Sequence, residues 1–251
     1  MLDRQRYFIE LAYDGSQYHG WQRQPNAITV QQVVEESLSK ITRTAVTITG
    51  AGRTDTGVHA RQMFAHFDIA SNPLPENLVY KMNRLLPRNI SIFRIFAVHD
   101  KAHTRFDAIA RSYEYHFHLR PDPFYNKSSY ILHRIPDFIL MQKAALKLLG
   151  SMDFKCFSRS QTQVKTYICD VSEARFEVSD LHVIFHITAN RFLRNMVRAV
   201  VGTLLQVGYG TIAIDDIDRI IASRDRNQAG SSAAAQGLYL SRIVYPVGLV
   251  S

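Results

Sequence analysis

The chain has 251 residues, 46% of them hydrophobic and 21% charged, a composition typical of a globular protein that folds without disulfides or a structural metal. No apolar run approaches the ~18 residues of a membrane-spanning helix and the start has no signal-peptide pattern, which excludes those two classes and favours a cytoplasmic protein with no membrane partner. The net charge is +8, with 22 arginines against 8 lysines, so nucleic acid is the favoured partner; a basic protein without such a partner is the alternative.

The first half of the sequence alternates between strand and helix patterns. In chain order it predicts a strand over residues 6–13, a helix over 30–41, strands over 45–48 and 62–69, a helix from after Pro75 to about residue 86, and a strand over 90–98. Thr29 is placed to cap the first helix, in which Val34 and Leu38 have helical spacing.

The second half repeats this alternation. In chain order it predicts a strand over residues 112–119, a helix over 138–149, a β-hairpin of 164–178 and 181–189, helices over 191–207 and 212–222, and a strand over 241–245. Residues 224–237 are rich in Gly, Ser and Ala and predict a mobile loop. We therefore expect an α+β protein with two related subdomains, residues 1–107 and 108–251, and a cleft between them.

The two cysteines, Cys156 and Cys169, are too few for a secreted disulfide scaffold. We expect both thiols to be reduced and buried.

The segment GRTDTGVH, residues 52–59, brings together two glycines, a guanidinium, a carboxylate and an imidazole just after a predicted strand. An aspartic protease needs two Asp-Thr-Gly or Asp-Ser-Gly triplets, or a dimer of very small chains, and this sequence has one triplet in 251 residues. Two interpretations remain open. Asp55 binds its own backbone in a tight turn, or the loop presents Asp55 as a reactive group from a rigid scaffold.

Three arginines follow helical spacing between residues 190 and 205. Arg191, Arg194 and Arg198 would fall within about 60° of one another on a helix, with apolar side chains on the other side. This face has no acidic partner within its own turns, which favours an anion from elsewhere. A solvated basic face remains the alternative for Arg191 and Arg194.

The strand expected near residue 112 alternates between two faces. It places Tyr113, Tyr115 and Phe117 on one face and Glu114, His116 and His118 on the other. No third ligand is spaced to join the two histidines, so we expect no metal.

At these residues the chain resembles the TruA family of tRNA pseudouridine synthases, nearly end to end. The motifs that carry the resemblance are Tyr13-Asp14-Gly15, Gly20-Trp21-Gln22, Thr29-Val30-Gln31, Gly52-Arg53-Thr54-Asp55, Gly57-Val58-His59-Ala60, Arg111-x-Tyr113-x-Tyr115, Phe192-Leu193, Met196-Val197-Arg198 with Gly202, and Gly237-Leu238-Tyr239-Leu240. The chain departs from the commoner family residues at Thr56, Ala102, Met152 and Ala234. These departures bear on loop geometry and substrate range rather than on the reaction.

The resemblance implies isomerisation of uridine to pseudouridine in tRNA, at positions 38, 39 and 40 of the anticodon arm. Other uridines in tRNA or small RNAs, and RNA binding without catalysis, are the alternatives. The fold implied is a pair of RRM-like (ferredoxin-like) halves with joined, mainly antiparallel sheets and a central basic cleft, in a homodimer. The reaction is redox-neutral and the detached base stays in the site, so no cofactor is required.

The resemblance also implies roles for individual residues. Asp55 is the nucleophile, Tyr113 stacks on the flipped uracil and moves a proton, and Arg198 forms an ion pair with Asp55. Substrate contacts are expected from Tyr113, from Leu238 closing the pocket, from Arg53 at the RNA backbone or the vacated stack, and from Arg191 and Arg194 at phosphates.

Overall fold

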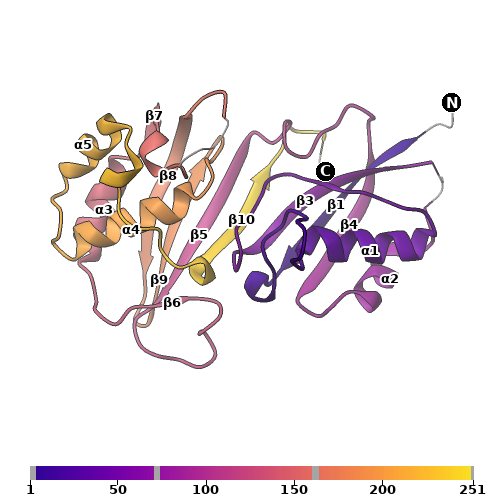
Figure 1. Cartoon of the computed structure of the whole chain (residues 1–251), viewed down its shortest axis with the longest axis horizontal. Helices are drawn as coiled ribbons and strands as arrows, with labels where there is room; N and C mark the ends of the chain where they lie inside the picture. The colour runs from indigo at the N-terminus through magenta and orange to yellow at the C-terminus, as the bar shows by residue number, and fades with distance from the viewer. Residues whose placement is uncertain (1–3, 71–73, 160–163, 250–251) are drawn as a thin grey trace. The chain divides into compact units, whose positions relative to one another are not determined.

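The computed structural model describes residues 4–70, 74–159 and 164–249 (Figure 1). Within these residues the chain is a mixed α/β protein with five α-helices and mostly antiparallel strands. It divides into two compact units, one formed by Met1–Ile109 with Leu240–Ser251 and the other by Ala110–Tyr239.

The first unit is a sheet covered by two helices that contact each other. Its elements are β1 (Gln5–Tyr13), α1 (Val30–Thr42), β2 (Thr49–Gly50), β3 (His59–Ile69), α2 (Leu78–Leu85) and β4 (Ile90–Val98). The strand order is β4-β1-β3, antiparallel throughout, and β2 pairs with β3. Strand β10 (Leu238–Val244) follows β3 in the sheet order, although it lies near the C-terminal end of the sequence.

The core of the first unit lies along β1 and β3. Phe8, Ile9 and Leu11 are fully buried although they are not all on one face of β1, so both faces of this strand are covered. On one side Tyr245 packs on the sheet, with ring centroids 5.8 Å from Phe8 and 5.2 Å from Phe64. The residues just after β10 therefore form part of this core.

Helix α1 forms as the sequence predicts. Thr29 Oγ1 accepts the Gln32 N–H at 3.4 Å, and Val30, Val34 and Leu38 are completely buried, one turn apart. The strand predicted over residues 45–48 is wrong, because these residues belong to no strand. Side chains of α1 occupy their N–H groups instead, with Glu35 Oε1 accepting from Ile48 at 3.0 Å.

The second unit has the same kind of layering. Its elements are β5 (Ala110–His118), β6 (Tyr130–Ile131), α3 (Phe138–Leu146), β7 (Gly150–Asp153), β8 (Ile168–Val178), β9 (His182–Ala189), α4 (Met196–Gly208) and α5 (Asp216–Ser223). The order β5-β9-β8-β7 is antiparallel, and β6 pairs in parallel with β5. Helix α3 packs on α4 and on β8 (Figure 1).

Several boundaries in the second unit differ from the prediction. Helix α3 ends at Leu146, and Gly150, with a φ of +95°, begins a short strand, β7, that periodicity did not indicate. The strand expected from residue 164 begins at Ile168, and the helix expected from residue 212 begins at Asp216. Both cysteines are free and buried, as predicted.

The prediction of a helix from residue 191 is wrong. Helix α4 begins at Met196, and Asn195 before it adopts a left-handed conformation with a φ of +67°. Long-range contacts hold the preceding residues, since the Arg194 carbonyl accepts from Arg159 N–H at 3.0 Å and Asn195 Nδ2 donates to Ser232 Oγ at 2.6 Å. The three arginines therefore do not share a helical face, and only Arg198 belongs to the helix.

The prediction of a mobile loop over residues 224–237 is also wrong. The segment contains two short 3-10 helices and packs along α4. Gly230 N–H donates to Thr203 Oγ1 at 2.8 Å, and a Cβ on Gly202 would lie 1.7 Å from the Ser231 carbonyl oxygen. Small residues on both sides are what allow the loop to approach the helix so closely.

Candidate active site

The GRTDTGVH segment forms the connection between β2 and β3 in the first unit. Asp55 is half-buried at its centre and Arg53 is exposed. The carbonyl of Asp55 accepts the Val58 N–H at 3.1 Å, and Gly57 takes a φ of +77°. The main chain thus contributes a hydrogen bond of its own to this turn.

The opening motif of the sequence holds this loop in place. Trp21 N–H donates to the Thr54 carbonyl at 3.2 Å, and the Tyr13 and Thr54 hydroxyls lie 2.9 Å apart. Gly57 N–H donates to the Tyr18 carbonyl at 3.3 Å. The residues on both sides of Asp55 are therefore fixed to a segment more than thirty residues earlier in the chain.

Two glycines allow this close approach. A Cβ on Gly15 would lie 1.9 Å from the Val58 carbonyl oxygen, and one on Gly20, whose φ is +84°, would lie 2.3 Å from the Thr54 carbonyl oxygen. No side chain fits at either distance. The loop carrying Asp55 is therefore packed backbone to backbone, which gives the carboxylate the rigid support that a reactive group needs.

His59 completes the support from the start of β3. Its imidazole is almost fully buried, and Nδ1 lies 3.1 Å from Gly15 N and 3.0 Å from Asp14 Oδ1. One ring nitrogen cannot accept from the amide and donate to the carboxylate together, so its tautomer decides which contact is a hydrogen bond. In either tautomer His59 ties β3 to the opening motif.

In the second unit Tyr113 lies on β5 opposite Ile187 of β9. Its half-buried ring makes an edge-to-face contact with Phe192, with centroids 5.0 Å apart and planes at 82°. This geometry is favourable for aromatic pairs and restrains the ring. Tyr113 is thus held by a neighbour from the third motif.

Arg198, in the first turn of α4, is anchored to the segment that was expected to be mobile. Its Nε donates to the Ala233 carbonyl at 2.6 Å, and its own carbonyl accepts from Ala233 N–H at 2.9 Å. Tyr115 donates its hydroxyl to the neighbouring Ala234 carbonyl at 2.8 Å. Burial raises the pKa of Tyr115 far above its usual range, so it acts here as a neutral donor.

The remaining predicted residues are also in the second unit. Leu238 is buried at the start of β10, after Gly237, whose Cβ would lie 2.8 Å from the His116 carbonyl oxygen. Arg191 is half-buried and Arg194 is exposed, both ahead of α4. Asp55 and Arg53 thus belong to one unit and the other five predicted residues to the other.

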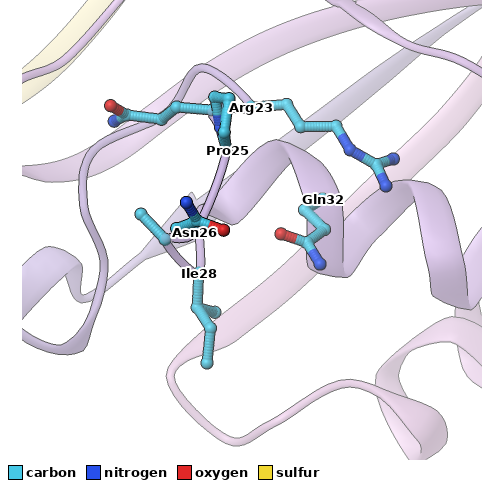
Figure 2. Close-up of a pocket in the computed structure, with 7 residues that line it drawn as sticks. Arg23, Pro25, Asn26, Ile28 and Gln32 are labelled. Carbon is cyan, nitrogen blue, oxygen red and sulfur yellow. The ribbon is translucent and has the colours of Figure 1, made fainter.

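A separate cavity of about 580 Å³ lies beside the start of α1 (Figure 2). Its lining residues are Arg23, Gln24, Pro25, Asn26, Ala27, Ile28 and Gln32. Arg23 is paired with Glu35 at 3.1 Å, and no predicted site residue lines the cavity. We therefore locate the candidate active site from the packing of the signature loop rather than from this cavity.

Among the residues that the structure describes, no three histidine, cysteine, aspartate or glutamate side chains gather where they could hold a metal ion. No helix in the described part of the chain is long and apolar enough to cross a membrane.

The supporting residues were not predicted as such. Tyr13, Gly20 and Trp21 stood in the sequence only as parts of motifs without a role of their own, and Tyr18 lies between two of these motifs. Their contacts with the Asp55 loop join positions far apart in the chain, and no local pattern signals such contacts.

Comparison with known proteins agrees with the motifs. The sequence profile described as tRNA pseudouridine synthase matches residues 11–107 and 144–246, more than half of the chain. The chain is 50% identical over 248 residues to tRNA pseudouridine synthase A of Porphyromonas gingivalis, covering 97% of this chain and 98% of that protein. The protein of the same name from Bacteroides fragilis is 47% identical over 96% of this chain and 97% of its own length, and that from Acetivibrio thermocellus is 39% identical over 94% and 97%. This chain belongs to the tRNA pseudouridine synthase family.

Proposed function

We propose that this protein isomerises uridine to pseudouridine in tRNA, without a cofactor and with Asp55 as the nucleophile. The observation that carries the proposal is the packing of the signature loop, which fixes the residues on both sides of Asp55 backbone to backbone. Family membership supports the reaction. Uridines 38, 39 and 40 of the anticodon arm are the proposed targets.

The chemistry needs one bond broken and one bond made. The bond between N1 of uracil and C1′ of ribose breaks, the base turns, and C5 of uracil bonds to C1′. The proton leaving C5 is balanced by a proton gained at N1, so nothing is oxidised or reduced. A carboxylate can start this sequence by attacking either the ribose or the base ring.

As the nucleophile, Asp55 acts as an anion inside a pocket that binds an uncharged base, and burying a charge without a partner is unfavourable. A guanidinium about 4–6 Å away would offset that burial. We propose that Arg198 is this cation. Its backbone and Nε are fixed by Ala233, which holds the side chain in a defined orientation. In the proposed site its guanidinium faces the carboxylate.

Tyr113 is the proposed partner of the extruded base. Flipping a stacked uridine out of a stem costs a few kcal/mol, and stacking on an aromatic ring returns about 1–3 kcal/mol. The edge-to-face contact with Phe192 would hold the Tyr113 ring ready for that stack. The hydroxyl is the proposed carrier of the proton released from C5.

Leu238 would close the other side of the pocket. The proposed phosphate contacts are Arg53, Arg191 and Arg194. The side chains of Arg53 and Arg194 are exposed and that of Arg191 is half-buried. Such contacts make tRNA affinity fall steeply as salt rises.

The order of the strands and helices in each unit supports the proposal that both units are RRM-like. The first unit runs β1-α1-β2-β3-α2-β4 with β1 between β3 and β4, the arrangement of a split βαβ or RRM-like domain. The second unit has β5, α3, β8, β9 and α4 in the corresponding sequence, with β9 between β5 and β8. We propose that the two RRM-like units join their sheets around a basic cleft, in a cytoplasmic homodimer.

The first test replaces Asp55 with alanine. Pseudouridine formation in unmodified tRNA, mapped by nucleotide and measured without added metal or nucleotide, should be abolished, while tRNA affinity stays within a few fold. Asp180→Ala, which removes an exposed carboxylate from the second unit, is the matched control and should leave the rate unchanged. Turnover by Asp55→Ala would remove Asp55 from the mechanism, and modification confined to other uridines would correct the proposed targets.

Two conservative changes test the partners. Tyr113→Phe keeps the ring and its contact with Phe192 but removes the hydroxyl, so we expect intact tRNA binding and a rate at least about ten-fold lower, as for loss of a general acid–base group. Arg198→Lys keeps the charge but not the planar fork. An unchanged rate for either variant would contradict the role given to that residue.

A further inference from the structure

The segment between β5 and β6 exposes an aromatic side chain that is not part of the protein core. Phe124 is 89% exposed, more than any other large aromatic residue in the described part of the chain. Burying a phenylalanine is worth roughly 1.5–3 kcal/mol, so this ring forgoes a contribution that most core aromatics make. In Figure 1 the segment is the long loop that extends past the β6 end of its own unit.

The loop that carries Phe124 is held firmly. Asp122 caps it, accepting Phe124 N–H on Oδ1 at 2.9 Å and Tyr125 N–H on its carbonyl at 3.1 Å. The Tyr125 ring stacks on His118 with centroids 4.8 Å apart, and Tyr239 donates its hydroxyl to the Ser128 carbonyl at 2.8 Å. Phe124 is therefore presented from a structured loop.

The charge around Phe124 is positive. Arg120 and Lys127 flank it within the loop and Arg134 follows β6, all three with exposed side chains. The only acidic residue in this stretch is Asp122, whose Oδ1 is already occupied by the turn. An exposed aromatic ring between cations is the combination that binds single-stranded nucleic acid, with stacking on the ring and phosphates on the cations.

The loop lies far from the proposed uridine pocket. Tyr113 is near the start of β5, whereas the loop leaves β5 after His118, where Leu132 returns to pair with it at 2.9 Å. His118 lies five residue steps along the extended strand from Tyr113, a span of about 17 Å. Phe124 therefore cannot stack on the nucleotide that Tyr113 holds.

We propose that Phe124 is a stacking platform for a second, unpaired base of the RNA substrate, with Arg120 and Lys127 on the neighbouring phosphates. The inference rests on the proposed function, because it assigns a further contact with the same RNA. The same loop of a second copy fits less well, because Arg120 and Lys127 of one copy would face the same two cations of the other.

The test compares Phe124→Ala with Phe124→Trp in the full chain. Dissociation constants for unmodified tRNA transcript at one fixed salt concentration should rise roughly 5- to 100-fold for alanine and stay within about two-fold for tryptophan, which restores a stacking surface. Ile139→Ala, which removes a 70% exposed apolar side chain from α3 in the same unit, is the matched control and should bind like the unaltered protein.

The rate of pseudouridine formation at saturating tRNA separates this inference from the proposed function. Phe124→Ala should keep that rate once tRNA is saturating, whereas Asp55→Ala should not. Unchanged affinity in Phe124→Ala, with the unaltered protein active, would overturn the stacking platform alone. A shift of Phe124→Ala to a smaller oligomer in gel filtration would also overturn it, in favour of a protein contact. An unaltered protein that binds tRNA but forms no pseudouridine would refute the proposed function instead.

Discussion

Gly20→Ala tests whether the backbone packing around Asp55 sets the rate. Gly20 has a φ of +84°, and its Cβ would lie 2.3 Å from the Thr54 carbonyl oxygen. Ordinary van der Waals contact begins at 3.4 Å, so the two chain segments must separate by about 1 Å. Because Thr54 precedes Asp55 directly, most of that shift reaches the carboxylate.

The expected effect has two parts. A left-handed alanine costs about 1–2 kcal/mol and its overlap with Thr54 about 1–3 kcal/mol more, which together lower the melting temperature by roughly 4–20 °C in a chain of this size. A displacement of ~1 Å in a reacting group lowers its rate by about 100-fold, or ~2.7 kcal/mol of transition-state stabilisation. The second effect should appear in single-turnover pseudouridine formation at a temperature where the variant is folded.

Gly248→Ala is the matched control. Gly248 is in the same unit and has a φ of +89°, but its Cβ would meet no atom within 4 Å. We expect a smaller loss of melting temperature, from the left-handed conformation alone, and no change in rate. If Gly20→Ala turns over at the unaltered rate, or if both variants lose the same activity, the backbone contact with Thr54 does not position Asp55.

Three further predictions concern stability and reactivity. Burial, together with the charges of its neighbours, lowers the pKa of His66 to about 4. Below about pH 6.5 the unfolded chain therefore binds a proton at this histidine that the folded protein does not bind, and the free energy of unfolding should fall by up to ~3 kcal/mol between pH 6.5 and 4. His66→Gln should flatten this slope in thermal melts. Burial raises the pKa of Cys156 to about 12 and that of Cys169 to about 11. A thiol reagent at pH 8 should therefore label the folded protein at least ten times more slowly than the unfolded chain. Equal labelling rates would show that the thiols are accessible. Gly202→Ala should destabilise the protein by about 1–3 kcal/mol in thermal melts, because its Cβ would lie 1.7 Å from a carbonyl oxygen. The control Gly52→Ala, whose Cβ meets nothing within 4 Å, should melt like the unaltered protein.

Elements governed by local signals were predicted well. Thr29 caps α1 as expected, and β4 has the predicted bounds, Ile90–Val98. The errors arose where distant contacts override the local pattern. Residues 191–195 have helical spacing, but hydrogen bonds to Arg159 and Ser232 hold them outside the helix.

The candidate site shows the same division. The motif made Asp55 and its neighbours candidates, but the glycines and carbonyls that fix the loop could be recognised only in three dimensions. Residues 224–237 were predicted to be a mobile loop because they are rich in Gly, Ser and Ala. The same small side chains let them pack on α4 and hold Arg198 through Ala233. Composition alone cannot separate these two outcomes.

Strand β10 has a consequence for how the protein is made. It belongs largely to the first unit, where Ile243 N–H donates to Gln62 Oε1 at 2.9 Å and the Tyr245 hydroxyl donates to the Thr104 carbonyl at 2.6 Å. A ribosome synthesises these residues only after the whole second unit, so a nascent chain can finish its second unit before its first. Until then β3 lacks this neighbour and offers a strand edge that invites aggregation. Early translational arrest would therefore be more hazardous for this protein than for one whose units fold in order of synthesis.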